Sequence, residues 1–347
     1  MPGIIFCGCA FTRAAEGHRQ GQAHPRRREV AIAGRRIRTV DIHAHCAVPE
    51  AHAVLGQRMD QQDLLMADTS ARLAAMDAQG IDMEALSINP WWYAAERDAA
   101  AEIIRIQNEA LAGLRDANPA RFTAFATAAL QHPELAAEQV EHAVRKLGFR
   151  GVGVGGSVEG LELADPRFNP FWAKCEELGA LVFLHPQGTR ELEGSGRLRG
   201  NGLLSNTIGN PLETTIALSH LIFEGTLDRY PGLRICAAHG GGYLPSYANR
   251  SDAVIRTFPN RVGPLPNKPP TAYLRGGQLF FDTIVFTPEA LRHLVAEVGA
   301  EHVVMGTDYP FPWTSTEVDL VMNTPGLTDA EREAILGGTA GRLLGIA

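Results

Sequence analysis

The sequence predicts an α/β protein built as a (β/α)8 barrel of the TIM type with small insertions. Eight short apolar runs alternate with segments of helical character along the chain, and this alternation is typical of parallel strands joined by right-handed helical crossovers. The length of 347 residues suits one such barrel. No Gly-x-Gly-x-x-Gly follows the first run, which argues against a dinucleotide-binding sheet.

The apolar runs have the length of buried strands and lie between turn signals. We expect strands over 38–43, 84–88, 122–126, 150–154, 181–185, 234–238, 278–282 and 302–305. Helices are expected between them, over 69–79, 98–117, 133–147, 169–178, 213–224, from about 244, over 288–298 and across 328–344. Gly80 provides a stop for the first helix, and Pro133 suits a helix start.

Composition and charge exclude several classes of protein. The chain is 45% hydrophobic and 20% charged, with a net charge of -7, so it has no basic footprint for nucleic acid and no basic patch for an anionic membrane. The five cysteines are scattered and odd in number, which favours a reduced, cytoplasmic protein. We expect a flexible extension over 1–37 and one metal-dependent barrel domain over 38–347.

Candidate metal ligands stand at the ends of four predicted strands: His43, His45, His185, His239 and Asp308. His43 and His45 are one residue apart, so an extended backbone points both to one face. A barrel brings the carboxyl ends of its strands together at its catalytic face. A single histidine at a strand end is more often a structural residue, but five such groups favour a metal site.

Imidazole and carboxylate ligands suit Zn²⁺, and also Mn²⁺ or Fe²⁺. We expect one divalent ion per chain, with Zn²⁺ favoured, because the strand over 150–154 offers no lysine or glutamate to bridge a second ion. An ion with an open position can orient an anionic substrate and stabilise developing charge. The glycines that follow that strand are interpreted as a tight turn, with a phosphate cradle as the alternative.

Four motifs carry a family resemblance: D-I-H-A-H at 41–45, F-L-H-P at 183–186, A-A-H-G-G-G at 237–242 and G-T-D-Y-P-F at 306–311. Together they resemble the amidohydrolase superfamily, and within it the decarboxylase branch typified by 2-amino-3-carboxymuconate-6-semialdehyde decarboxylase. The likeness extends over nearly everything from 40 to 345. The first motif alone marks only the superfamily, whereas the third and fourth together are much more specific.

The resemblance implies that His43, His45, His185 and Asp308 bind the metal. It implies that His239 is an acid/base group beside the metal, so that His239 and Asp308 are the candidate catalytic residues. Members of this branch release CO₂ from a small carboxylic acid without an oxidant or organic cofactor. Asp308 is in both sets, so we expect it to be a metal ligand and a catalytic group.

The resemblance also implies residues that bind the substrate. Arg250 aligns with an arginine that the family supplies across a dimer interface to a substrate carboxylate, so we expect a homodimer or a higher homo-oligomer. Asn206 stands where the family has a tryptophan, and an arginine-bearing segment of the family has no convincing counterpart here. Trp91, Phe286 and Trp313 are candidates for aromatic walls around a planar ring, with core packing as the equal alternative.

Three functions compete at this point. The first is a metal-dependent, non-oxidative decarboxylase of a small unsaturated or aromatic carboxylic acid. The second is a metal-dependent amidohydrolase, lactonase or hydratase that acts on a small carboxylate. The third is a binding protein stabilised by a metal; it is disfavoured because structural metal sites are usually closed, and His239 is surplus to a four-ligand set.

Overall fold

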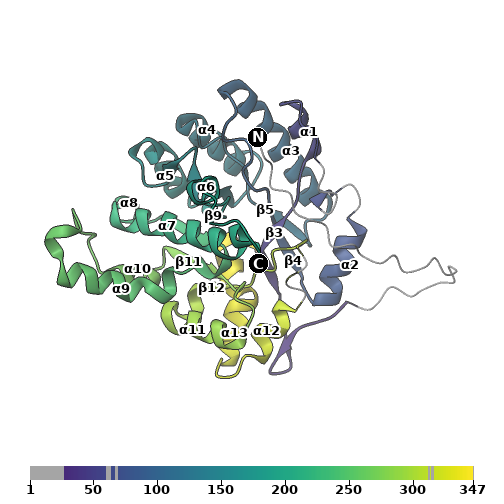
Figure 1. Ribbon diagram of the computed structural model, residues 1–347. Coiled ribbons are helices and arrows are strands. Elements are labelled where there is room, and N and C mark those ends of the chain that lie inside the picture. The colour runs from purple at the N-terminus through teal and green to yellow at the C-terminus, as the bar shows by residue number, and fades with distance from the viewer. Residues whose placement is uncertain (1–26, 60–63, 67–68, 312, 314–315, 347) are drawn as a thin grey trace, which may run out of the picture.

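Eight parallel strands form the centre of the molecule, and helices surround them (Figure 1). The computed structural model describes residues 27–59, 64–66, 69–311, 313 and 316–346. One sheet has three strands, in the order β3 (Val40–His45), β4 (Met83–Ser87) and β5 (Phe122–Ala124). The other has five, in the order β6 (Gly151–Val154), β9 (Leu181–Leu184), β10 (Arg234–Ala237), β11 (Leu279–Asp282) and β12 (Val303–Val304).

The two sheets meet at two seams. A parallel bridge joins Ala126 to Val152 beyond the end of β5, and a second joins Ala44 of β3 to Tyr309 beyond β12. At the second seam the amide of Asp308 donates to the carbonyl of His43 over 2.7 Å. The predicted (β/α)8 fold is confirmed, and each predicted strand is present with ends that differ by at most two residues.

The helices also follow the prediction, with shorter ones between them. The longer ones are α2 (Ser70–Gln79), α3 (Arg97–Ala117), α4 (Pro133–Arg145), α5 (Asn169–Leu178), α7 (Asn210–Phe223), α9 (Leu244–Thr257) and α11 (Pro288–Val298). After β12 come α12 (Glu317–Asn323), α13 (Asp329–Glu333) and α14 (Thr339–Leu344). The short ones are α1 (Pro49–Ala53), α6 (Arg190–Gly194), α8 (Thr226–Arg229) and α10 (Pro270–Leu274). No helix in the described ranges is long and apolar enough to cross a membrane.

An irregularity in β3 sets the direction of the histidines at its end. The pairing of β3 with β4 shifts register between Asp41 and Ala44. Ile42 belongs to the inner core of the barrel, and the ring of the next residue, His43, also lies against an inner residue, Phe183, at 4.9 Å between centroids. A regular strand would place these neighbours on opposite faces. The irregularity therefore turns the end of β3 so that His43 faces the interior.

The segment just before β3 packs against the barrel. Residues 27–37 contain a hairpin, β1 (Ala31–Ile32) and β2 (Arg35–Arg36), and Val30, Ile32 and Ile37 are buried because they pack on the main core. Arg28 pairs with Asp319 of α12; Figure 1 shows this purple segment beside α12. The domain division at residue 37 stays a prediction, and residues 1–26 lie outside the described part of the chain.

We expect Gly151→Ala to destabilise the barrel. A Cβ at Gly151 would lie 2.4 Å from the carbonyl oxygen of Leu181 and 2.7 Å from the ring of Phe125, and such overpacking costs about 1–3 kcal/mol. Gly113→Ala is the matched control, because Gly113 is exposed on α3 with no atom within 4 Å of an added Cβ. Urea unfolding should show a lower midpoint for Gly151→Ala and an equal or higher one for Gly113→Ala. Equal midpoints for Gly151→Ala and the wild type would contradict the tight packing between β6 and β9.

Candidate metal centre

The five strand-end groups that the sequence singles out meet in one place. One oxygen of Asp308, Oδ1, lies 3.2 Å from His43 Nε2 and 2.8 Å from His45 Nε2. The two Nε2 atoms are 2.9 Å apart. The ring of His185 lies 4.7 Å from that of His45 and 5.0 Å from that of His43, and 5.3 Å from that of His239. These donors come from the ends of four strands that are far apart in the sequence. The barrel brings them within reach of one ion.

Hydrogen bonds on the outer side of two rings orient them towards this point. The outer nitrogen Nδ1 of His185 lies 2.8 Å from the carbonyl oxygen of Pro186 and can only donate to it. The hydroxyl of Ser87 donates its proton to the carbonyl of Ala44. Its oxygen can therefore only accept from His45 Nδ1, which lies 3.2 Å away. Both rings therefore carry their proton on Nδ1 and turn the Nε2 lone pair inward. That is the tautomer that a metal ligand needs.

His43 is oriented by Asp282, the last residue of β11. Its Nδ1 lies 2.7 Å from Asp282 Oδ2, and both side chains are fully buried. The same oxygen accepts the amide of His239 at 2.9 Å, and Oδ1 accepts the amide of Gly240 at 2.8 Å. Sequence reasoning missed Asp282, although it ends a predicted strand as the other site residues do. Its position at the end of a strand is the sequence signal that could have identified it.

The charges of the centre are suited to a cation. Burial lowers the pKa of His43, but the carboxylates of Asp308 and Asp282 outweigh it and raise that pKa to about 10. Burial lowers the pKa of His45 to about 4 and, with the nearby imidazoles, lowers that of His185 well below its usual range. Burial works to raise the pKa of Asp308, yet the imidazoles hold it well below its usual range. In the metal-free protein His43 is therefore the protonated imidazole, whereas His45 and His185 are neutral. Once a divalent ion displaces that proton, three imidazoles and an ionised carboxylate form the donor set of a metal site.

His239 lies differently from the other histidines. Its side chain is 16% exposed, against 0% and 2% for His43 and His45. Its Nε2 is 3.8 Å from the second oxygen of Asp308, Oδ2, and its Nδ1 is buried without a hydrogen-bond partner. His43, His185, His239 and Asp308 also form a group whose ligating atoms all lie within 4.8 Å of one another. Distance alone does not choose between His45 and His239 as the fourth ligand.

Backbone strain marks both His239 and Asp308. Each has a positive φ, 55° and 60° respectively, a conformation that costs a residue other than glycine about 1–3 kcal/mol and is concentrated at functional sites. The turn after His239 needs Gly242, where φ is 64° and an added Cβ would meet the carbonyl oxygen of Pro211 at 2.1 Å. The packing of α7 against this turn thus explains the last glycine of the A-A-H-G-G-G motif.

Buried charges behind the centre hold the strand ends together. Asp41 accepts hydrogen bonds from the amides of His43 and Thr307, each at 3.0 Å, and thereby ties β3 to the turn that carries Asp308. Arg72 of α2 donates to the carbonyl of His45 at 3.0 Å, and its guanidinium lies 4.6 Å from the ring centre of Tyr309. Sequence reasoning did not identify Asp41 or Arg72. Arg72 carries no sequence signal, because a helical arginine is usually exposed.

One predicted substrate-binding residue contacts the centre directly. The indole Nε1 of Trp313 donates to Asp308 Oδ2 over 2.7 Å, and the indole is 41% exposed. The ring of Phe311 is near both aromatic neighbours: its centroid lies 5.7 Å from that of His45 and 6.0 Å from that of Trp313. Trp313 is thus an aromatic neighbour of the centre.

The structure shows no contact from the other four candidates to the centre among the described residues. Arg250 is exposed on α9, and Asn206 is half-buried in the turn that precedes α7. Trp91 stacks on His52 at 3.8 Å between ring centroids, and Phe286 is 58% exposed after β11. Their roles in binding substrate stay predictions.

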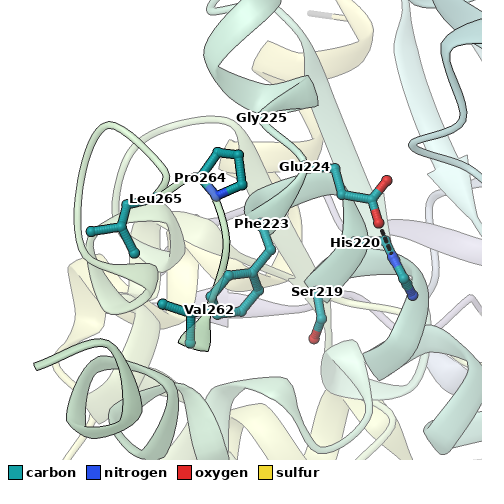
Figure 2. Close-up of a pocket in the computed structure, with 8 residues that line it drawn as sticks. All are labelled: Ser219, His220, Phe223, Glu224, Gly225, Val262, Pro264 and Leu265. Atoms are coloured by element: carbon teal, nitrogen blue, oxygen red, sulfur yellow. Dashed lines mark hydrogen bonds and ion pairs between the residues drawn. The ribbon is translucent and has the colours of Figure 1, made fainter. Parts of the chain in front are cut away.

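One open groove lies away from the centre. It has a volume of about 580 Å³ and runs between α7 and the segment after α9, as Figure 2 shows. His220 and Glu224 pair with each other along one wall, and Phe223, Val262 and Leu265 make it apolar. The groove shares no residue with the five-group cluster, so it is not where the predicted chemistry takes place.

Comparison with known proteins agrees with this geometry. The amidohydrolase family model matches residues 40–346. The chain belongs to this family. It is 30% identical over 310 residues to the 2-amino-3-carboxymuconate-6-semialdehyde decarboxylase of Dictyostelium discoideum. The matched region covers 88% of this chain and 85% of that protein. The predicted family resemblance is therefore confirmed.

Two solved structures extend the likeness. The 5-carboxyvanillate decarboxylase of Sphingomonas paucimobilis matches with a TM-score of 0.82 and 25% identity, over 90% of this chain and 100% of that one. A dihydroxybenzoic acid decarboxylase of Polaromonas sp. JS666, solved with bound manganese and the inhibitor 2-nitroresorcinol, matches with a TM-score of 0.78 and 27% identity, over 89% of this chain and 97% of that one. These relatives confirm the prediction that this amidohydrolase-family chain is a carboxy-lyase.

We expect a buried carboxyl near the centre to make stability depend on pH. Burial raises the pKa of Glu317 to about 8 from its ordinary 4.5, although Thr283 donates to it. The folded protein thus holds this proton more tightly than the unfolded chain, so the stabilisation is complete below pH 4.5 and declines as the pH rises towards 8. Glu317→Gln should remove up to about 1.4 kcal/mol per pH unit of this slope.

Urea unfolding of the metal-free protein at several pH values between 5 and 8 measures this slope. Glu289→Gln, at an exposed position on α11, is the control and should keep the wild-type slope. If the Glu317→Gln and wild-type curves run parallel, Glu317 is already ionised in the folded protein.

Proposed function

We propose that the protein is a metal-dependent, non-oxidative decarboxylase of a small aromatic or unsaturated carboxylic acid. The observation that carries the proposal is the convergence of histidine rings and the carboxylate of Asp308 on one point, with His239 facing the second oxygen of the same carboxylate. The manganese-containing decarboxylase of the same fold supports it. The other two relatives, from Dictyostelium discoideum and Sphingomonas paucimobilis, are also named as decarboxylases, which supports the proposal further.

We propose His43, His45, His185 and Asp308 as the ligands of one divalent ion. The inward tautomer of His45, held through Ser87, favours it over His239, whose ring is more exposed and nearer to the other oxygen. Zn²⁺ is our first choice because three imidazoles and a carboxylate suit it, with Mn²⁺ and Fe²⁺ as alternatives. When bound, such an ion orients the anionic substrate and stabilises negative charge that develops on it.

His239 and Asp308 are then the groups that move the proton. His239 Nε2 lies 3.8 Å from Asp308 Oδ2, so its ring faces this carboxylate without a direct hydrogen bond to it. The reaction adds a proton to the carbon that bears the carboxylate; the bond to that carboxylate then breaks, its electron pair returns to the unsaturated system, and CO₂ leaves. Trp313, which donates to Asp308 Oδ2, would lie along one face of a planar substrate. Phe286, Trp91 and Asn206 are proposed as more distant pocket residues.

We propose a homodimer, or a higher homo-oligomer, in which Arg250 reaches the site of the partner. Arg250 lies on an exposed face of α9. Large apolar side chains are exposed on the same helix and after it, at Tyr247, Phe258 and Leu265, and a second copy would cover them. A guanidinium fork suits a carboxylate. We also place the enzyme in a reducing compartment, the cytoplasm, because Cys46, Cys175 and Cys236 are free and buried.

We expect CO₂ release without oxidant from a panel of 2-hydroxybenzoates, dihydroxybenzoates and muconate semialdehyde acids. The metal-loaded enzyme should lose roughly 10²–10⁴-fold in turnover with His239→Ala, because the acid/base group is gone. That variant should retain about one metal ion per chain, whereas His45→Ala should lose the ion. Headspace CO₂ and metal analysis measure the two outcomes.

Lactones and amides assayed with the same preparation are the control for the competing function. Hydrolysis of a lactone with no CO₂ from any acid of the panel would replace the decarboxylase proposal by the hydrolase. Loss of metal from His239→Ala, with metal kept by His45→Ala, would exchange the proposed roles of the two histidines.

We expect Arg250→Ala to raise the KM for the substrate by roughly 10–100-fold, because a hydrogen bond to a charged group is lost. Arg256→Ala, at another position on α9, is the matched control and should leave KM unchanged. Hybrid dimers of Arg250→Ala and His239→Ala should recover about a quarter of wild-type activity, because half of randomly formed dimers are mixed and each holds one intact site. No recovery after proven subunit exchange would contradict the shared site.

A further inference from the structure

The side chain of Asp282 receives four hydrogen bonds in a fully buried place. Oδ2 accepts from His43 Nδ1 at 2.7 Å and from the amide of His239 at 2.9 Å. Oδ1 accepts from the amides of Gly240 at 2.8 Å and Ile284 at 3.1 Å. One carboxylate therefore touches the ring of a proposed ligand and the backbone of the proposed acid/base residue.

We propose that Asp282 is a positioning residue that fixes the tautomer of His43 and the place of His239 together. The inference rests on the proposed metal site and concerns how this chain prepares it. A carboxylate without a proton can only accept, so it keeps the proton of His43 on Nδ1 and leaves the Nε2 lone pair free for the ion. Through the same oxygen it holds the amide of His239, whose positive φ of 55° needs such support.

The geometry makes Asp282→Asn a sharp test, because asparagine has nearly the same shape. If the amide NH₂ replaces Oδ1, it faces the two backbone donors Gly240 and Ile284. If it replaces Oδ2, it faces the amide of His239 and the ring of His43. The ring is the only one of these four groups that can change from donor to acceptor. Its proton then moves to Nε2, and His43 can no longer bind the metal.

The experiment titrates the metal-free full-length protein with Mn²⁺, followed by electron paramagnetic resonance of the free ion. We expect Asp282→Asn to weaken Mn²⁺ binding about 10–100-fold, the usual effect of losing such a partner of a metal-bound histidine. X-ray absorption of the variant at saturating Zn²⁺ should count one imidazole fewer than in the wild type. Neither readout needs substrate or turnover.

Glu317→Gln is the matched control. It exchanges another buried carboxyl for an amide beside the neighbouring residue Thr283, without touching a histidine ring, and it should keep the wild-type affinity and imidazole count. An unchanged imidazole count in folded Asp282→Asn would overturn the proposal. Failure of the wild type itself to bind Mn²⁺ or Zn²⁺ would instead overturn the proposed metal site.

If Asp282→Asn does not fold, Asp282→Ser and Asp282→Ala provide the second comparison. Serine keeps an acceptor on the side of His43, directly or through a water, whereas alanine keeps none. We expect Asp282→Ser to bind Mn²⁺ more tightly than Asp282→Ala and to keep the wild-type imidazole count. Equal affinity and equal counts in the two variants would overturn the tautomer role.

Discussion

The arrangement depends on burying an ionised carboxylate where several imidazole lone pairs converge. Such a group is costly to remove from water unless a positive charge lies beside it. In the metal-free chain the second proton of His43 supplies that charge, as its raised pKa shows. A divalent ion would replace this proton and meet the lone pairs of His45 and His185 as well. The centre is therefore built for a cation before any cation arrives.

This constraint explains several features at a distance from the centre. The register shift in β3 turns His43 inward, and Asp41 ties that strand to the turn of Asp308. Arg72 fixes the carbonyl of His45 from behind. Each contact holds a backbone segment and not only a side chain. Donor positions defined to a few tenths of an ångström are what a metal site requires.

The sequence predicted the fold well because the periodic signals were strong. Eight apolar runs and the helices between them are properties of local composition, and the five strand-end groups follow from the barrel once its strands are assigned. The hairpin at 31–36 was not predicted, because its buried residues Val30, Ile32 and Ile37 are separated by charged and small ones that hide the pattern. The register shift was also not predictable, since it depends on pairing with β4.

The residues that sequence reasoning missed share a physical reason. Asp282 and Arg72 act through buried hydrogen bonds to partners far along the chain, 239 positions away for His43 and 27 for His45. Nothing in their local sequence records such a partner. Asp282 alone could have been found by the rule that identified the proposed ligands, because it ends β11 where those residues meet. The two aspartates at strand ends differ in the atoms that they face. Asp308 turns its oxygens to imidazole Nε2 atoms, as a metal ligand would. Asp282 turns its oxygens to the Nδ1 atom of His43 and to three backbone amides, as a group that orients a ligand would.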